Sequence, residues 1–128
     1  MHKSISDIIS GTVVVSVKPS DSVRQAAQAM YEMDVGAVAV VEGGRLCGIF
    51  TERDALRFFA TTRRNPYTIN VEVVMTRNPV TIAADTTTDE ARNIMISNGF
   101  RHLPVLQDDT VVGMVSLRGL EMDSKWLG

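Results

Sequence analysis

The chain has 128 residues, 45% of them hydrophobic, which is enough apolar material for the core of one ordinary domain. Its 13 basic and 15 acidic residues give a net charge of −2, whereas a general nucleic-acid binder needs excess basic groups to neutralise phosphates. The single cysteine cannot form an intramolecular disulfide, and no segment approaches the roughly 20 apolar residues of a membrane span. We therefore expect a cytoplasmic protein with no membrane span and no nucleic-acid partner.

The first half of the chain predicts alternating strands and helices. They are an extended segment at 12–17, a helix from Ser20 or Asp21, a strand at 37–41, a turn at 42–45, a strand at 46–50 and a helix at 52–62. Ser and Asp side chains mark the beginning of the helix because they accept from its free N–H groups, and Gly36 marks its end. We expect apolar residues at helical spacing to pack into the core. These residues are Val23, Ala26, Ala27, Met30 and Met33.

The second half repeats this order of elements. It predicts an extended segment at 79–82, a helix from Asp85 or Thr86 to Gly99, strands at 102–106 and 111–115 around a turn, and a helix from about Ser116. An offset of 65 aligns residues 13–55 with the second half without a gap. Identical pairs include Ala26/Ala91, Met30/Met95, Val40/Val105, Gly48/Gly113 and Arg53/Arg118. The matching order of elements indicates an internal duplication.

The duplication predicts the organisation of the domain. A unit of about 50 residues buries too little apolar surface to be stable alone. We therefore expect one module over residues 1–128, with a first repeat at 8–60, a linker at 61–72 and a second repeat at 73–124. The fold class is α/β (α+β), as two β-α-β-β-α repeats packed sheet to sheet with pseudo-twofold symmetry. The segments leading into the repeats, 5–9 and 71–75, are also similar.

Two residues at the beginning of the helix at 52–62 have a spacing suited to binding. The Thr51 hydroxyl and nearby N–H groups favour an anion such as phosphate. Asp54 lies one turn further along on about the same face, where a carboxylate can accept from the hydroxyls of a ribose. Gly48 permits close backbone approach. The alternative is that Thr51 is only an N-cap and Asp54 only a first-turn acid that complements the helix dipole.

Three segments resemble motifs of the cystathionine β-synthase (CBS) domain family. They are Val74-Met75-Thr76-Arg77-Asn78-Pro79-Val80-Thr81-Ile82, Arg101-His102-Leu103-Pro104-Val105 and Gly48-Ile49-Phe50-Thr51-Glu52-Arg53-Asp54. The resemblance covers nearly the whole chain. With its two repeats, the chain is similar to a tandem CBS pair, or Bateman module. It implies a regulatory, non-catalytic module that binds an adenosine-containing ligand.

The resemblance also implies which residues form the ligand site. One wall comes from the first repeat and the other from the second, with Arg101 and His102 facing phosphate and Val80 and Pro104 packing on adenine. The full set is Gly48, Ile49, Phe50, Thr51, Asp54, Val80, Thr81, Arg101, His102, Leu103 and Pro104. At the second site Ser116 keeps the hydroxyl, but Gly119 replaces the acid and 36–39 replaces the basic wall. We expect that site, with Val15, Ser16, Ala37, Ser116 and Arg118, to be weak.

Two functions remain open at this point. The first is a stand-alone sensor of AMP, ADP or ATP, or of NAD or S-adenosylmethionine, which needs no cofactor and acts on an unknown effector protein. The second is a ligand-free interaction module that forms homodimers or docks to a partner. Its candidate surface is Ala55, Leu56, Phe58, Phe59 and 114–120. We expect no enzyme, because Cys and His do not cluster at metal spacing and nothing orders a catalytic triad.

Overall fold

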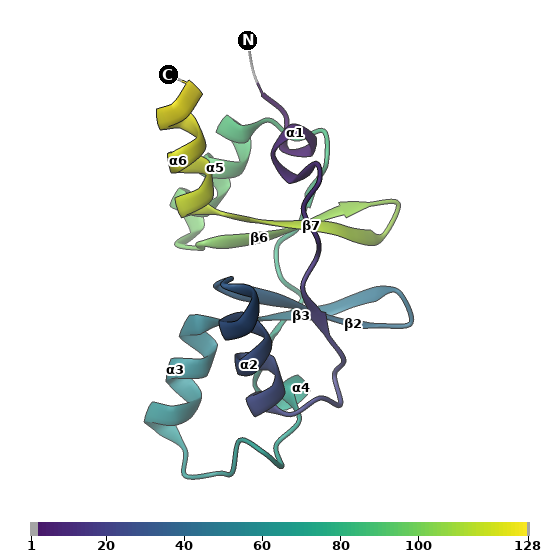
Figure 1. Cartoon of the computed structure of the whole chain (residues 1–128), viewed down its shortest axis with the longest axis vertical. Coiled ribbons are helices and arrows are strands. Elements are labelled where there is room, and N and C mark those ends of the chain that lie inside the picture. Colours follow the sequence, from purple (N-terminus) through teal and green to yellow (C-terminus); the bar gives the residue numbers. More distant parts are fainter. Residues whose placement is uncertain (1–2, 128) are drawn as a thin grey trace. The chain divides into compact units, whose positions relative to one another are not determined.

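The computed structural model describes residues 3–127 and shows a mixed α+β fold with two sheets (Figure 1). The chain forms two compact units. Unit 1 comprises Met1–Val13 with Val80–Gly128, and unit 2 comprises Val14–Pro79. Each unit contains one of the two duplicated sheets, so the duplication seen in the sequence is a duplication of folded units.

Unit 2 is built on a four-stranded sheet in the order β1 (Ser16–Val17), β2 (Ala37–Glu42), β3 (Arg45–Thr51) and β4 (Thr76–Arg77). β1 is parallel to β2, and the other neighbours are antiparallel. The helices are α2 (Val23–Met33), α3 (Glu52–Thr61) and the short α4 (Val71–Val74). α2 contacts β2, and both α3 and α4 contact β3, so these helices cover the apolar side chains of the sheet.

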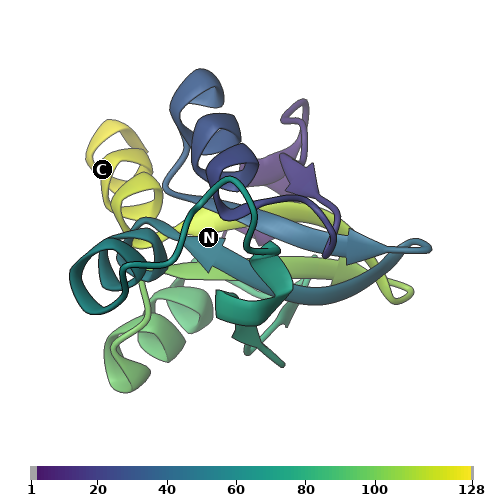
Figure 2. The ribbon, with the colours of Figure 1, turned by 90° about the horizontal axis from the view of Figure 1, so that it is seen from below.

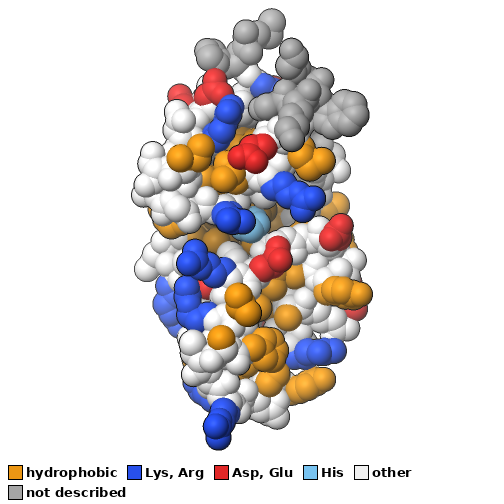
Figure 3. Space-filling view, turned by 90° about the vertical axis from the view of Figure 1, so that its left-hand side faces the viewer, with side chains coloured by type: hydrophobic (Ala, Val, Ile, Leu, Met, Phe, Trp, Pro, Cys, Tyr) orange, Lys and Arg blue, Asp and Glu red, His pale blue; other side chains and the backbone are white. Residues whose placement is uncertain are grey.

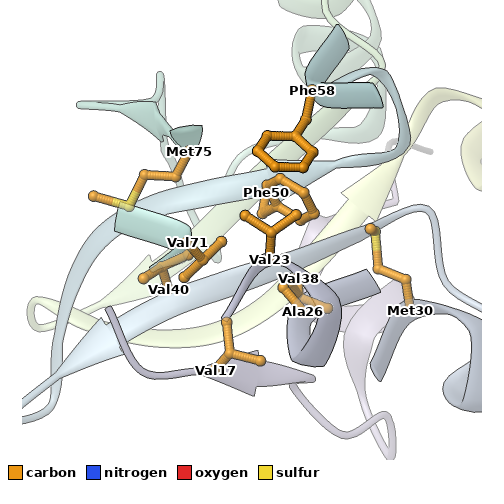
Figure 4. Packing of buried hydrophobic residues seen from close by; sticks show 10 residues of the cluster. All are labelled: Val17, Val23, Ala26, Met30, Val38, Val40, Phe50, Phe58, Val71 and Met75. Atoms are coloured by element: carbon orange, nitrogen blue, oxygen red, sulfur yellow. The ribbon is translucent and has the colours of Figure 1, made fainter. Parts of the chain in front are cut away.

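The core of unit 2 is apolar and well enclosed (Figure 4). Phe50 of β3 is fully buried and points toward Phe58 of α3, and Val23 of α2 lies next to Phe50 (Figure 4). Burying an aromatic side chain contributes about 3 kcal/mol relative to leaving it in water. The cluster consists of Val17, Val23, Ala26, Met30, Val38, Val40, Phe50, Phe58, Val71 and Met75.

Unit 1 has a three-stranded sheet in the order β5 (Ile82–Ala83), β6 (His102–Gln107) and β7 (Thr110–Ser116). Its helices are α1 (Ile5–Ile9), α5 (Thr88–Asn98) and α6 (Leu117–Leu127). The core cluster consists of Ile5, Ile82, Ala91, Met95, Leu103, Val105, Val115 and Leu120. In both units the two long strands form a hairpin that ends in a tight turn (Figure 2). The positive φ angles of Gly43 and Gly44, and of Asp108 and Asp109, confirm the predicted turns.

The segment leading into each repeat packs against the other repeat. The carbonyls of Pro66 and Ile69, which precede the second repeat, accept from the N–H groups of Arg24 and Val23 at the beginning of α2. In unit 1 the Lys3 carbonyl accepts from the N–H of Thr88 at the beginning of α5. These bonds satisfy N–H groups that an isolated helix leaves free. The exchange explains why unit 2 continues to Pro79 and why unit 1 includes the N-terminal segment.

Several helix boundaries differ from those expected. α2 is capped by Ser22 rather than Ser20 or Asp21, and α5 by Thr87 rather than Asp85 or Thr86. In each case the side-chain hydroxyl accepts from the N–H three residues later, which selects the capping residue. α2 ends at Asp34, with φ of 53°, so Gly36 is not its C-cap, whereas Gly99 is the C-cap of α5 as expected.

Some residues assigned to the core or to the surface lie elsewhere. Met33 is 55% exposed and does not fill the core. Of the candidate interaction surface, Phe58 and Leu120 are buried because each helix turns one side toward its own sheet, and Val115 is buried because it lies in β7 within the core cluster of unit 1. Leu56 and Phe59 remain exposed. Figure 3 shows basic side chains distributed over this face, and the exposed arginines of α3 and the segment after it are Arg53, Arg57, Arg63 and Arg64.

Candidate functional site

The end of β3 leads directly into α3, and Thr51 lies at this junction. Its backbone is extended, and its hydroxyl accepts from the Asp54 N–H at 3.1 Å. In return, the Asp54 carboxylate accepts from the Thr51 N–H at 3.0 Å. This reciprocal capping box satisfies two N–H groups that the first turn would leave free. Thr51 is therefore an N-cap and Asp54 a first-turn acid, which is what the alternative interpretation of this sequence segment predicts.

Asp54 is only 5% exposed, and its buried carboxylate has partners beyond those of the capping box. The Thr76 hydroxyl of β4 donates to its carboxylate, at 3.1 Å from Oδ2 and 3.3 Å from Oδ1. Arg57 Nη1 lies 3.6 Å from Oδ1 and forms an ion pair with it. Buried carboxylates require such partners, since an unpaired charge in the interior costs several kcal/mol. Thr76 was not predicted as a partner of Asp54 from the sequence, although it lies within one of the motifs that resemble the CBS family.

Gly48 allows β4 to reach this carboxylate. β4 pairs with β3 through Gly48 opposite Arg77 and Ile49 opposite Thr76. A Cβ atom on Gly48 would lie 2.5 Å from the Thr76 carbonyl oxygen and 2.8 Å from the Met75 sulfur. The predicted role of Gly48 in close backbone approach therefore has a structural basis within unit 2.

Ile49 and Phe50 occupy the strand between Gly48 and Thr51, and both side chains are buried. The Phe50 side chain is 0% exposed and belongs to the core cluster. Phe50 is therefore available to a ligand only through its backbone, because its ring is enclosed by the apolar residues of unit 2.

The junction of β7 and α6 in unit 1 corresponds to the junction of β3 and α3, but it has glycine at the position of Asp54. The Ser116 hydroxyl accepts from the Gly119 N–H at 2.9 Å, so the N-cap is kept. Glycine has no carboxylate to return the bond, and the sheet of unit 1 has three strands in the described residues. A Cβ on Gly113 would meet Ile9 side-chain atoms at 2.8–3.0 Å, so an apolar side chain lies where unit 2 has the backbone of β4.

This comparison predicts that Gly119→Asp stabilises unit 1. The new carboxylate can complete a capping box with Ser116, and a helical glycine is removed; each change contributes about 1 kcal/mol. A Cβ on Gly119 would lie 2.9 Å from the Ser116 hydroxyl oxygen, and a small shift of that side chain relieves the contact while its bond to the N–H of residue 119 is kept. We expect a higher midpoint in thermal unfolding, and a lower midpoint would contradict the comparison.

The other predicted wall lies in unit 1. Val80 and Thr81 form the extended segment before β5, Arg101 precedes β6, and His102, Leu103 and Pro104 begin β6. The side chain of Arg101 is exposed, and His102 is half-buried. Leu103 is 1% exposed and belongs to the core, so its side chain serves packing. Arg101, His102 and Val80 keep side-chain surface for a ligand.

Pro104 changes the backbone hydrogen bonding of this wall. In unit 2 the Ala39 N–H donates to the Val15 carbonyl at 3.0 Å. The offset of 65 places Pro104 at the position of Ala39 and Val80 at that of Val15. Proline has no N–H, so it cannot donate to the Val80 carbonyl. The Val80 carbonyl therefore lacks the backbone donor that its counterpart, the Val15 carbonyl, has in unit 2.

The residues of the expected weak site are also divided between the units. In unit 2, Ser16 begins β1, Ala37 begins β2 and Val15 directly precedes β1, where its carbonyl accepts from the Ala39 N–H. Ser116 and the exposed Arg118 lie at the beginning of α6 in unit 1. Within residues 3–127, no group of three potential metal ligands occurs, and no helix is long and apolar enough to cross a membrane.

Comparisons with known proteins agree with this architecture. The family model described as the CBS domain matches twice, at residues 5–61 and 68–120. A 17.7 kDa protein of Acidianus ambivalens is 37% identical over 114 residues, which cover 88% of this chain and 68% of that protein. The chain spans 50% of the mitochondrial CBS protein CBSX3 and 21% of CBSCBSPB1, both of Arabidopsis thaliana.

Solved structures share the whole fold. A CBS-domain-containing protein from Agrobacterium tumefaciens superposes with a TM-score of 0.87 at 32% identity, covering 95% of this chain and 99% of that one. A CBS domain pair in complex with 5′-methylthioadenosine and S-adenosyl-L-methionine superposes with a TM-score of 0.89, covering 100% of both chains. At 22% identity, the latter shows the fold alone. Together the two family matches and the shared architecture show that this chain belongs to the CBS domain family and is a tandem CBS pair.

Proposed function

We propose that this CBS pair is a regulatory module that binds one adenosine-containing nucleotide of the AMP, ADP or ATP class. The observation that carries the proposal is the buried Asp54 carboxylate at the N-terminus of α3. Capping alone can be done by an exposed acid, as Asp7 shows in α1. A carboxylate that is desolvated and held by two other elements of unit 2 is suited to accept from a ribose hydroxyl.

The base is proposed to be adenine because of the Val80 carbonyl. An adenine amino group can donate to a carbonyl that Pro104 leaves without its sheet partner, whereas the carbonyl oxygen of hypoxanthine would repel it. Binding sites that use a hydrogen bond to select a group reject analogues without that group strongly. Arg101, exposed at the beginning of β6, supplies the positive charge for phosphate. As the CBS resemblance implies, these residues and Asp54 serve the same ligand.

The relatives support the ligand class and the regulatory role. A CBS pair of the same fold was solved with two adenosine compounds. The absence of a carboxylate at Gly119 supports one strong site per chain rather than two. Binding would act on an effector protein by favouring one state of the module, and such a shift requires different affinities for the two states.

Docking or self-association is the second candidate function. Leu56 and Phe59 are 69% and 60% exposed on α3, next to the exposed Arg53 and Arg57. Exposed large apolar side chains that lie one helical turn apart are typical of interaction surfaces. Light scattering tests this candidate, since a homodimer through α3 would dissociate when Leu56 and Phe59 are replaced by Ser.

Isothermal titration of the purified protein with AMP, ADP and ATP, and with IMP and GMP for comparison, tests the proposed function. We expect saturable AMP binding and at least about tenfold weaker binding of IMP and GMP, because neither presents the amino donor in the position of the adenine amino group. Failure of AMP, ADP and ATP to bind, or equal binding of AMP and IMP, would contradict the proposal.

A further inference from the structure

The Asp54 carboxylate has unequal hydrogen bonding at its two oxygens. Oδ2 accepts from the Thr51 N–H at 3.0 Å and from the Thr76 hydroxyl at 3.1 Å. Oδ1 receives only the longer branch of the Thr76 hydroxyl, at 3.3 Å, and the Arg57 ion pair at 3.6 Å. A carboxylate can accept about four hydrogen bonds. Oδ1 is therefore the oxygen that keeps capacity for a further donor.

The capping box alone does not fix the orientation of this oxygen. The terminal torsion of an Asp side chain is broad, so one hydrogen bond to Oδ2 leaves the carboxylate plane free to turn about it. The Thr76 hydroxyl reaches both oxygens from a different element, β4, and holds the plane. Its single proton is used in doing so, which leaves Thr76 no donor for a ligand.

Thr76 is held in place by the backbone of β4. The strand pairs with β3 at Ile49 and Gly48, and Arg77 Nη2 donates to the Glu72 carbonyl at 2.7 Å. The bare Cα of Gly48 permits this close pairing. In unit 1, Gly119 replaces the acid and Ile9 packs on Gly113. The donor strand and the carboxylate thus occur together in unit 2, and the described part of unit 1 has neither.

We propose that Thr76 is a positioning residue for ligand binding: its hydroxyl orients the Asp54 carboxylate so that Oδ1 accepts from a ligand hydroxyl. This proposal rests on the proposed function for its ligand. A positioning role differs from a packing role because loss of the Thr76 hydroxyl affects ligand binding only when the Asp54 carboxylate is present. A packing role would instead change binding whether or not the carboxylate is present.

The test is a double-mutant cycle with AMP as the probe. Thr76→Val keeps the shape of the side chain and removes the hydroxyl. It is expected to weaken AMP binding by about tenfold, the lower end of the value of a ligand hydrogen bond to a charged acceptor, because the Asp54 carboxylate is no longer oriented for that bond. Thr76→Ser is expected to retain near-native affinity. In the Asp54→Ala background, Thr76→Val should change the affinity less than about twofold, because no carboxylate remains to orient. An unchanged affinity in Thr76→Val, an equal loss in the Asp54→Ala background, or no rescue by Ser would overturn the proposal.

A measurement without ligand separates this proposal from the proposed function. The side-chain carboxyl ¹³C resonance of Asp54, followed by NMR at fixed pH, is expected to move in Thr76→Val and to stay near its native position in Thr76→Ser. If the resonance behaves in this way but no variant binds AMP, the proposed nucleotide is wrong while the orientation of Asp54 stands. A resonance that does not move in Thr76→Val would overturn the positioning role whatever the binding result.

Discussion

Replacing Asp54 by Ala is expected to weaken AMP binding by about 10- to 100-fold, the equivalent of one hydrogen bond between a charged acceptor and a ribose hydroxyl. The carboxylate is 5% exposed, and Oδ1 is its less occupied oxygen. Desolvation strengthens a hydrogen bond to this group, because water does not compete for it. Titration calorimetry of the wild type and the variant with AMP measures the change.

Asp7→Ala is the matched control. Asp7 is the equivalent first-turn acid of α1, and its carboxylate accepts from the Ser4 N–H at 3.3 Å. Asp7 is exposed, so its loss removes the same charge and a similar cap without opening a buried site. We expect AMP affinity within about twofold of the wild type, since only a helix cap is lost. Equal losses in the two variants would show that charge or helix stability, rather than contact with the ligand, determines the affinity.

Gly48→Ala is expected to lower the free energy of unfolding by about 3 kcal/mol, at the upper end of the range for overpacking. The added Cβ would lie 2.5 Å from the Thr76 carbonyl oxygen, a backbone atom that cannot rotate away. Relief requires β4 to separate from β3, which also removes Thr76 from Asp54. Urea unfolding therefore should show lower stability, and calorimetry should show weaker AMP binding in the same variant.

Gly113→Ala provides the comparison within unit 1. Its added Cβ would meet Ile9 side-chain atoms at 2.8–3.0 Å, and these atoms can be removed by mutation. We expect Ile9→Ala to recover part of the stability lost in Gly113→Ala, whereas Met75→Ala should not rescue Gly48→Ala because the Thr76 carbonyl remains. Rescue in both pairs would show that side chains alone, rather than β4, limit the space at Gly48.

The sequence was sufficient for the fold because local signals and the duplication agree. The apolar spacing predicted α2 and α5, and the turn residues predicted both hairpins. Helix beginnings were displaced by one or two residues, because several Ser, Thr and Asp residues in succession could each act as the cap. Only the backbone geometry at Ser22 and Thr87 shows which hydroxyl accepts.

The site was predictable only in part. The spacing of Thr51 and Asp54 predicted an N-cap and a first-turn acid, and the structure has both and joins them in a reciprocal capping box that was not predicted. Thr76 is 22 residues from Asp54 in sequence, so no local pattern could reveal their hydrogen bond. The exchange of lead-in segments was equally hidden, because similarity between residues 5–9 and 71–75 does not say which repeat each contacts.

Equilibrium dialysis of labelled AMP against the wild-type protein tests the central claim, that the two halves share a fold but only one carries the carboxylate of a strong site. Saturation is expected at one AMP per chain, and Asp54→Ala is expected to show no binding at the same AMP concentrations. Saturation at two equivalent AMP molecules per chain, or no saturable binding, would contradict it.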